Sequence, residues 1–182
     1  MFKISVQELK PALTNVLGTI RKTEDMPTIA QARIVSDGER VTVTATDRFI
    51  AFEQVLYERK GDKDPFDLDP FELNISLEAL ELINKLPKGR SLEIDGDGVR
   101  AGKITFSPSD EDYPNVKSLI DNAWDDEQWL GLERKYLAGY NPQLVKHIKD
   151  VKIIPHPGGA GRARLQAPHL KGVIIGVKID GK

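Results

Sequence analysis

The chain lacks cysteine, long apolar runs and a signal-like N-terminus. Without cysteine, disulfides, thiolate zinc sites and cysteine nucleophiles are excluded, which fits a reducing compartment. No uninterrupted apolar segment approaches the length of a membrane span, and the N-terminal MFKISVQELK carries charge where a signal peptide needs apolar residues. These absences predict a soluble, cytoplasmic protein with no membrane partner.

The chain also lacks a surplus of positive charge. Its 26 basic and 28 acidic side chains leave a formal net charge of -2, so bulk electrostatics predict no polyanion partner. Any nucleic-acid-binding surface must therefore be local. The hydrophobic content of 40% over 182 residues is enough for a sizeable core in one large or two small domains.

No arrangement typical of catalysis is visible. The three histidines, His147, His156 and His169, lack helical metal-ligand spacing, and we expect them at the surface. The glycine-rich residues 158–162 could cradle a phosphate, but they fit a flexible hairpin turn better. Asp47 has no identifiable carboxylate partner for acid/base work, so a structural Asp that binds the turn backbone is the better interpretation. We expect no cofactor, no metal site and no enzymatic activity.

A strand, a helix and three further strands are predicted at the N-terminal end. Phe2 to Val6 alternates like a half-buried strand, and Ser5 with Glu8 forms a candidate capping box. A helical apolar stripe follows up to Ile20, although Pro11 implies that the helix starts later or is kinked. Three strands are then expected at 29–35, 40–46 and 50–55, with Asp37-Gly38 as a hairpin turn.

The same order restarts after the Asp/Pro/Gly-rich residues 61–70, which have the composition of a linker. Residues 71–75 alternate, Ser76 is a candidate N-cap, and a short helical stripe follows from Leu77 to Leu86. A hairpin of strands 91–94 and 99–106 completes this second copy.

A third copy is expected after the acidic segment 121–129, near which we place a boundary. Residues 136–140 look extended, and Asn141-Pro142 is typical of a helix start. The buried stripe of this third helix would comprise Leu144, Val145, Ile148 and Val151. Strands are expected at 162–166 and 172–179.

Three restarts at roughly sixty-residue spacing make an internal repeat the main feature of the sequence. We predict an α+β fold with antiparallel sheets and helices on one face. Residues 1–120 would form one complete domain of two repeats, and residues 121–182 an additional half-domain.

Positive charge recurs on the exposed side of each predicted helix. The candidate DNA-binding residues are Lys10, Arg21, Lys22, Lys85, Lys88, Lys146 and Lys149. Ordinary solvation of surface helices is an equally good explanation, and Glu78 and Glu81 weaken the pattern on the second helix. If the helices share one surface, these side chains could bind phosphate backbone without reading bases.

Several stretches resemble the bacterial DNA sliding clamp family. MPTIAQARIVSDGERVTVTATDRFIA, residues 26–51, is similar to that family's stretch of proline, strand, hairpin and Ala-Thr-Asp. DEDYPN at 110–115 resembles the acidic, aromatic, proline segment that closes a clamp domain. GYNP at 139–142 resembles the entry to the helix of the last half-domain.

The resemblance implies a shortened clamp. The family's chains are about twice as long, and its terminal Met-Pro-x-Arg type ending is replaced here by GVKIDGK, so its pocket for partner peptides is not carried over. If the family's ring of about a dozen half-domain units holds, chains with three units would close it as a tetramer.

The sequence therefore predicts a homo-oligomeric, sliding-clamp-like protein that holds duplex DNA independently of sequence. It would tether a polymerase or another replication protein. Two alternatives remain open: a clamp-derived interaction module that forms no ring, and a small-molecule enzyme that uses Asp47 and a histidine.

Overall fold

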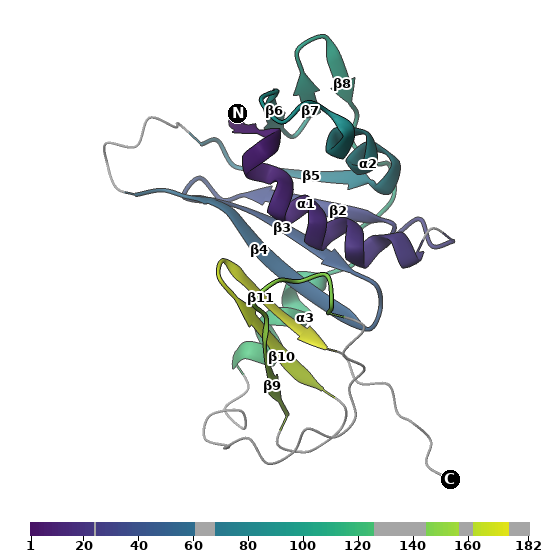
Figure 1. Ribbon diagram of the computed structural model, residues 1–182, viewed down its shortest axis with the longest axis vertical. Coiled ribbons are helices and arrows are strands. Elements are labelled where there is room, and N and C mark those ends of the chain that lie inside the picture. Colours follow the sequence, from purple (N-terminus) through teal and green to yellow (C-terminus); the bar gives the residue numbers. More distant parts are fainter. Residues whose placement is uncertain (24, 61–67, 126–144, 157–161, 175–182) are drawn as a thin grey trace.

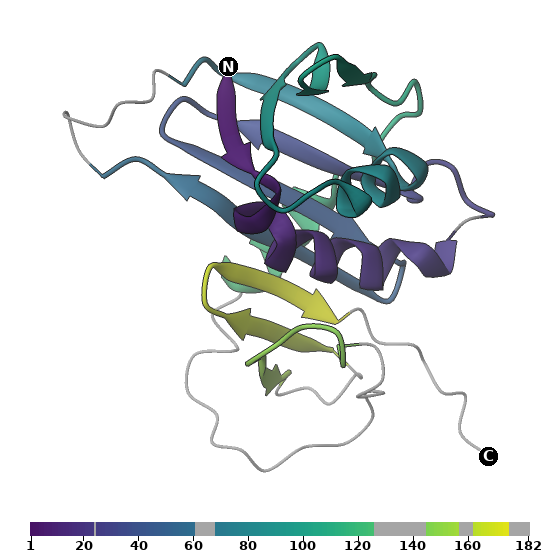
Figure 2. The same cartoon turned by 45° about the horizontal axis from the view of Figure 1, so that its top comes forward.

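The computed structural model describes residues 1–23, 25–60, 68–125, 145–156 and 162–174, apart from the side chains of Lys22 and Pro155. Their arrangement is shown in Figure 1. Two antiparallel sheets carry α1 and α2 on one side, and a third helix lies on the other side of the larger sheet (Figures 1 and 2). The α+β class predicted from the sequence is confirmed.

The first unit has the predicted order of strand, helix and three strands. Its elements are β1 (Phe2–Ser5), α1 (Val6–Ile20), a short 3-10 helix (Arg21–Thr23), β2 (Gln31–Ser36), β3 (Arg40–Thr46) and β4 (Ile50–Glu58). The Ser5–Glu8 capping box is present, so α1 begins at Val6. Pro11 lies inside the helix with its ring exposed, so of the two alternatives drawn from Pro11, a later start or a kink, the later start is wrong.

The second unit repeats this order. Its elements are β5 (Phe71–Ser76), α2 (Leu77–Lys85), β6 (Ser91–Asp95), β7 (Gly98–Ala101) and β8 (Ile104–Phe106). Ser76 caps α2 by accepting a hydrogen bond from the backbone N–H of Ala79. The predicted strand 99–106 is two strands, because the chain turns at Gly102, whose φ of 68° is accessible to glycine at little cost.

The two units exchange their first strands. β1 pairs with β6 in a four-stranded sheet of order β1-β6-β7-β8, and β5 pairs with β2. Each unit therefore supplies one edge strand to the sheet of the other. A common core fills the space between the sheets and the helices, with Val16 and Ile20 of α1, Phe52 of β4 and Ile83 of α2 among its most buried members.

Three strands extend the second sheet beyond the first unit. They are β9 (Lys152–Pro155), β10 (Ala163–Ala167) and β11 (Leu170–Ile174). β11 pairs antiparallel with β4, which gives a seven-stranded sheet of order β5-β2-β3-β4-β11-β10-β9. β9 was not expected, and β10 and β11 begin within two residues of the predicted strands.

The predicted third helix is not found in the part of it that is described. Residues 145–150 form turns, with a hydrogen bond from the N–H of Ile148 to the carbonyl of Val145 and a positive φ of 55° at Asp150. Val145 and Ile148 are buried as predicted. A spacing of three residues places side chains on one side of a tight turn as well as of a helix, which is why the pattern misled.

The helix α3 (Val116–Asp125) was not predicted. It packs on β4 and β11, against Ala51 and Val173, whereas the neighbouring Phe52 of β4 points into the core beneath α1. Because successive strand residues face opposite sides, α3 covers the side of the seven-stranded sheet away from α1.

The expectations for residues 61–67, 126–144, 157–161 and 175–182 lie outside the described residues. They include the helix start Asn141-Pro142, Leu144, the glycine-rich turn and the end of the last strand.

Candidate nucleic-acid interface

The helices α1 and α2 lie side by side on one surface of the molecule (Figure 2). Both bury an apolar stripe and expose the opposite side, where Thr14 of α1 and Leu82 of α2 are exposed. The alignment that the DNA-binding hypothesis required is therefore present for the first two predicted helices.

Two of the candidate cations join these helices to each other. The ammonium group of Lys10 donates a hydrogen bond to the carbonyl of Asn84 at 3.0 Å and is partly buried. The guanidinium of Arg21 pairs with the carboxylate of Glu81 at 2.7 Å. Both side chains hold α1 against α2, and Arg21, with half of its side chain exposed, also faces solvent.

Two other candidates are free of such contacts within the described residues. Lys85 ends α2 and Lys88 follows Pro87, and both are exposed. The backbone of Lys22 lies in the 3-10 helix after α1, and its side chain lies outside the described part.

The turn at residues 145–150 brings Lys146 and Lys149 to the side of α1. The imidazole Nε2 of His147 lies 2.8 Å from the hydroxyl of Thr19, and its ring occupies the space that a side chain at Gly18 would need. His147 is therefore half-buried against α1, contrary to the expected surface position. Lys146 and Lys149 themselves are exposed.

The helix surface is only weakly basic. Glu8, in the α1 capping box, and Glu78, in the first turn of α2, are exposed on the same two helices as the cations. Hydrogen bonds from Ser5 lower the pKa of Glu8, so its carboxylate stays charged. Any contact with phosphate through this face would therefore be weak and sensitive to salt.

Asp47 has the structural role that we expected. Its Oδ1 accepts hydrogen bonds from the backbone N–H groups of Phe49 at 3.0 Å and Ile50 at 2.8 Å. These bonds fix the β3–β4 turn, in which Arg48 has a φ of 77°. The arrangement is that of a buried turn-forming Asp.

The other histidines lie in or beside turns, with His169 exposed between β10 and β11 and His156 half-buried after β9. Within the described ranges, no group of three or more His, Asp or Glu side chains could hold a metal ion. No helix of the described part is long and apolar enough to cross a membrane.

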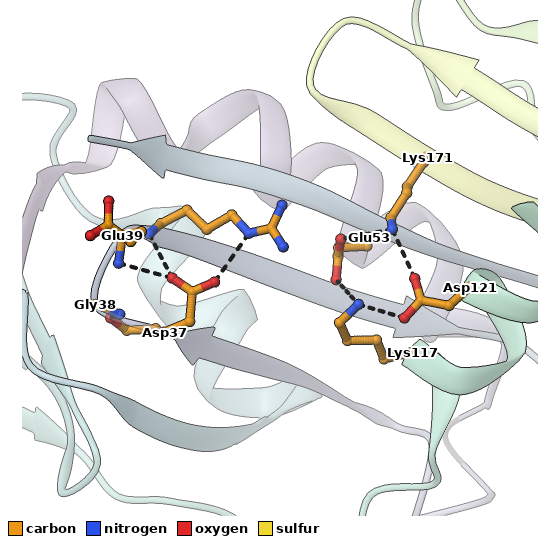
Figure 3. Close-up of polar contacts among 9 residues, drawn as sticks. Asp37, Gly38, Glu39, Glu53, Lys117, Asp121 and Lys171 are labelled. Atoms are coloured by element: carbon orange, nitrogen blue, oxygen red, sulfur yellow. Dashed lines mark hydrogen bonds and ion pairs between the residues drawn. The ribbon is translucent and has the colours of Figure 1, made fainter. Parts of the chain in front are cut away.

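Sequence reasoning missed a cluster of charged side chains beneath α3 (Figure 3). Glu53 of β4 is almost fully buried and lies 3.8 Å from the ammonium of Lys117 and 3.6 Å from that of Lys171. Asp121 binds the same two lysines at 2.6 and 2.8 Å. The quartet, two carboxylates and two ammonium groups, joins α3 to both β4 and β11.

The hydrogen bonds within this quartet shift the titration of its members. Partial burial alone would raise the pKa of Asp121. Hydrogen bonds from Lys117 and Lys171 outweigh this and hold the pKa of Asp121 below its usual value. Partial burial alone would lower the pKa of Lys171. The hydrogen bond to Asp121 and the negative charge of Glu53 outweigh this and raise the pKa of Lys171. Asp121 and Lys171 are therefore both charged at neutral pH.

A second set of contacts holds the C-terminal end of α3. The guanidinium of the buried Arg164, on β10, donates to the carbonyls of Ala123 at 2.8 Å and Trp124 at 2.9 Å. The indole N–H of Trp124 donates to the carbonyl of Gly172 at 3.2 Å. A cation at the last carbonyls suits the helix dipole. The spacing of Val116, Ile120 and Ala123 is the sequence signal that could have revealed α3.

Two strand-helix-three-strand units that exchange strands and place their helices on one face define the fold of a DNA sliding clamp. Solved structures agree with this. The DNA polymerase sliding clamp of Bacillus subtilis is similar with a TM-score of 0.62 and 16% identity, covering 99% of this chain and 64% of that one. A putative DNA polymerase III beta subunit from Eubacterium rectale gives a TM-score of 0.68 at 9% identity, covering 99% and 66%.

The DNA polymerase III beta subunit of Thermotoga maritima gives a TM-score of 0.61 at 13% identity, with 97% of this chain and 64% of that chain covered. The present chain thus spans less than two thirds of the length of each of these proteins. No protein-family model matches the sequence, and no curated protein matches it significantly.

Proposed function

We propose that this protein is a non-catalytic, sliding-clamp-like factor that holds duplex DNA along α1 and α2 and tethers a polymerase or another DNA-processing enzyme to it. The observation that carries the proposal is the strand-exchanged pair of units with both helices on one surface, the fold shared with DNA polymerase sliding clamps. The protein would act in replication, in the cytoplasm.

Retention on DNA would be topological, supported by weak phosphate contacts. Lys85, Lys88, Lys146 and Lys149 are the strongest candidates because all four are exposed. Lys10, Arg21 and Lys22 would contribute less, since Lys10 and Arg21 already bind groups of α2. Weak contacts of this kind leave a clamp free to slide.

A ring would require self-association. Within the described part, the β8 edge of the four-stranded sheet carries no neighbouring strand, and Ile104 on it is 49% exposed. An open edge of this kind can pair with a strand of a second copy. Four copies would supply the dozen units of a ring, with residues 1–120 as the complete domain and residues 121–182 as the half-domain; α3 lies across this proposed boundary.

The test replaces Lys85, Lys88, Lys146 and Lys149 by Gln and measures retention on nicked circular DNA against linear DNA. We expect retention on the circle to fall and its dependence on salt to flatten, because each lost phosphate contact lowers the salt slope by about one unit. A control variant with Lys103 and Lys152 replaced by Gln, two exposed lysines away from α1 and α2, should behave like the unmodified protein.

Equal retention of the unmodified protein on circular and linear DNA would contradict topological binding. Together with a monomeric mass in sedimentation, that result would favour the interaction module that forms no ring.

A further inference from the structure

A groove of about 660 Å³ lies on the four-stranded sheet, on the side away from the helices. It is lined by Pro87, Gly89, Arg90, Ser91, Glu93, Arg100 and Gly102. Its position follows from the alternation along β6 and β7. Leu92, Ile94 and Val99 are buried in the core that α1 shares, so Ser91, Glu93 and Arg100 point the other way. DNA held along α1 and α2 would not reach this groove.

The loop that forms one wall of the groove is held rigidly. The carbonyls of Lys88 and Arg90 accept hydrogen bonds from the backbone N–H groups of Gln7 and Val6, at 3.0 and 2.9 Å. These donors belong to the first turn of α1, where helices leave N–H groups without internal partners. The N–H of Arg90 also donates to the carbonyl of Pro87 at 2.9 Å. The start of α1 therefore fixes the backbone from which Arg90 extends.

The carboxylates beside the groove are largely neutralised by neighbouring cations. Glu93 pairs with Lys3 at 2.8 Å, and Asp95 pairs with Arg100. Hydrogen bonding and the charge of Lys3 lower the pKa of Glu93. Asp97 also lies near Arg100.

In the described part of the chain, one cation that lines the groove remains without an ion pair, and a second follows a lining residue in the chain. Arg90 is exposed and makes no ion pair within the described residues, and its side chain lies close to Gly102. Lys103, the residue after Gly102, is exposed as well. A guanidinium held on a rigid loop, with a free ammonium group nearby, matches the planar carboxylates of acidic side chains.

We infer that this groove docks an acidic surface segment of the enzyme that the clamp tethers. The choice of partner rests on the proposed function, and the choice of an acidic segment rests on charge complementarity with Arg90 and Lys103. The groove and the helix surface lie on opposite sides of the core, so the protein could hold its enzyme without giving up DNA contacts.

The experiment measures binding of a fluorescein-labelled poly-Glu peptide by anisotropy at low salt, with the full chain and two double variants. Replacing Arg90 and Lys103 by Ala should weaken binding by about fivefold or more, because charge-assisted hydrogen bonds are lost. The matched control, Lys152→Ala with Arg162→Ala, removes one exposed lysine and one exposed arginine outside the groove and the proposed DNA contacts, and should change binding less than about twofold. Both pairs are exposed, so the fold is preserved.

Equal weakening in the two variants would overturn the inference, because binding would then follow bulk charge. Absence of peptide binding by the unmodified protein would also overturn it. A lower oligomeric mass of the Arg90/Lys103 variant would assign the groove to a second copy, and a loss of DNA retention would assign it to DNA; either result rejects an enzyme-docking groove. The peptide measurement uses no DNA, so its outcome is separate from that of the clamp proposal.

Discussion

β4 and β8 hold the same position in the two units, as the last strand of each, but their outer edges differ. β4 pairs over residues 50–54 with β11, and α3 covers this junction from the side away from α1. β8 has three residues, no second neighbour within the described part, and an exposed Ile104.

The difference shows what a permanent strand junction requires. At β4, the backbone of Gly172 comes so close that an added Cβ would lie 2.5 Å from the carbonyl oxygen of Ala51. Ile120 of α3 closes an apolar patch over the junction, and the Glu53 quartet joins the helix to both strands. A short edge such as β8 lacks these supports and suits reversible pairing.

The largest effect on the closed junction should come from Ile120→Ala. Ile120 is fully buried between α3, to which it belongs, and the sheet, so its truncation leaves a cavity that should lower the free energy of unfolding by about 3 kcal/mol. Leu119→Ala, at the preceding residue of the same helix, which is 40% exposed, should cost less than about 1 kcal/mol. Urea unfolding measures both, and similar values would show that α3 does not support the junction.

A smaller loss of stability against unfolding is expected for Gly172→Ala. The added methyl group would meet Ala51 and Phe52 of β4, and moving the two strands apart should cost about 2 kcal/mol. Gly89→Ala is the control, because nothing lies within 4 Å of a Cβ built there. Faster amide exchange in β4 and β11 of the Gly172 variant would locate the damage, and unchanged exchange there would contradict the close approach.

Asp121→Asn should cost about 1 kcal/mol at neutral pH, because the partly exposed quartet loses one carboxylate and solvent screens the rest. The folded-state pKa of Asp121 is lowered, so its stabilisation is present above the unfolded value of about 3.9 and is lost as pH falls through the folded pKa.

The difference in stability between Asp121→Asn and the unmodified protein should therefore shrink below about pH 4. Asp125→Asn, at the exposed end of α3, should show little loss at any pH. A loss for Asp121→Asn that stays constant down to low pH would argue against the ionic explanation.

The smallest effect on folding, under about 0.5 kcal/mol, is expected for Ile104→Lys on the open edge. If β8 pairs with a second copy, the buried lysine should shift the assembly toward monomers by at least about tenfold in dissociation constant. Sedimentation over a range of concentrations measures this shift. An unchanged mass would remove β8 from the assembly contact.

The sequence was sufficient to predict the order of helices and strands in the first two units, because the local capping and turn signals there agreed with the structure. The Ser5–Glu8 capping box, the Asp37-Gly38 turn and the Ser76 cap each formed where predicted, and Asp37 binds the backbone of its own turn (Figure 3). The exchange of β1 and β5 was not predictable, since alternation shows that a segment is a strand but not which strand it joins.

The candidate site was predicted only in outline. Exposure of Lys85 follows from helical spacing, but the contact of Lys10 with Asn84 depends on how α1 meets α2. The Arg90 groove was missed because its members come from a loop and two strands, and only the folded sheet brings them together.

The exchange of β1 into the four-stranded sheet also sets the order in which the chain can fold during synthesis. Phe2 pairs with Ile94, so the first strand has no partner until more than ninety residues have been made. Closing so large a loop is entropically costly and slow. The emerging first unit would remain open, with β2 lacking β5, until the second unit leaves the ribosome. A truncated chain that ends before residue 70 lacks both β5 and β6, and should consequently be prone to aggregation because β1 and β2 are left without these partner strands.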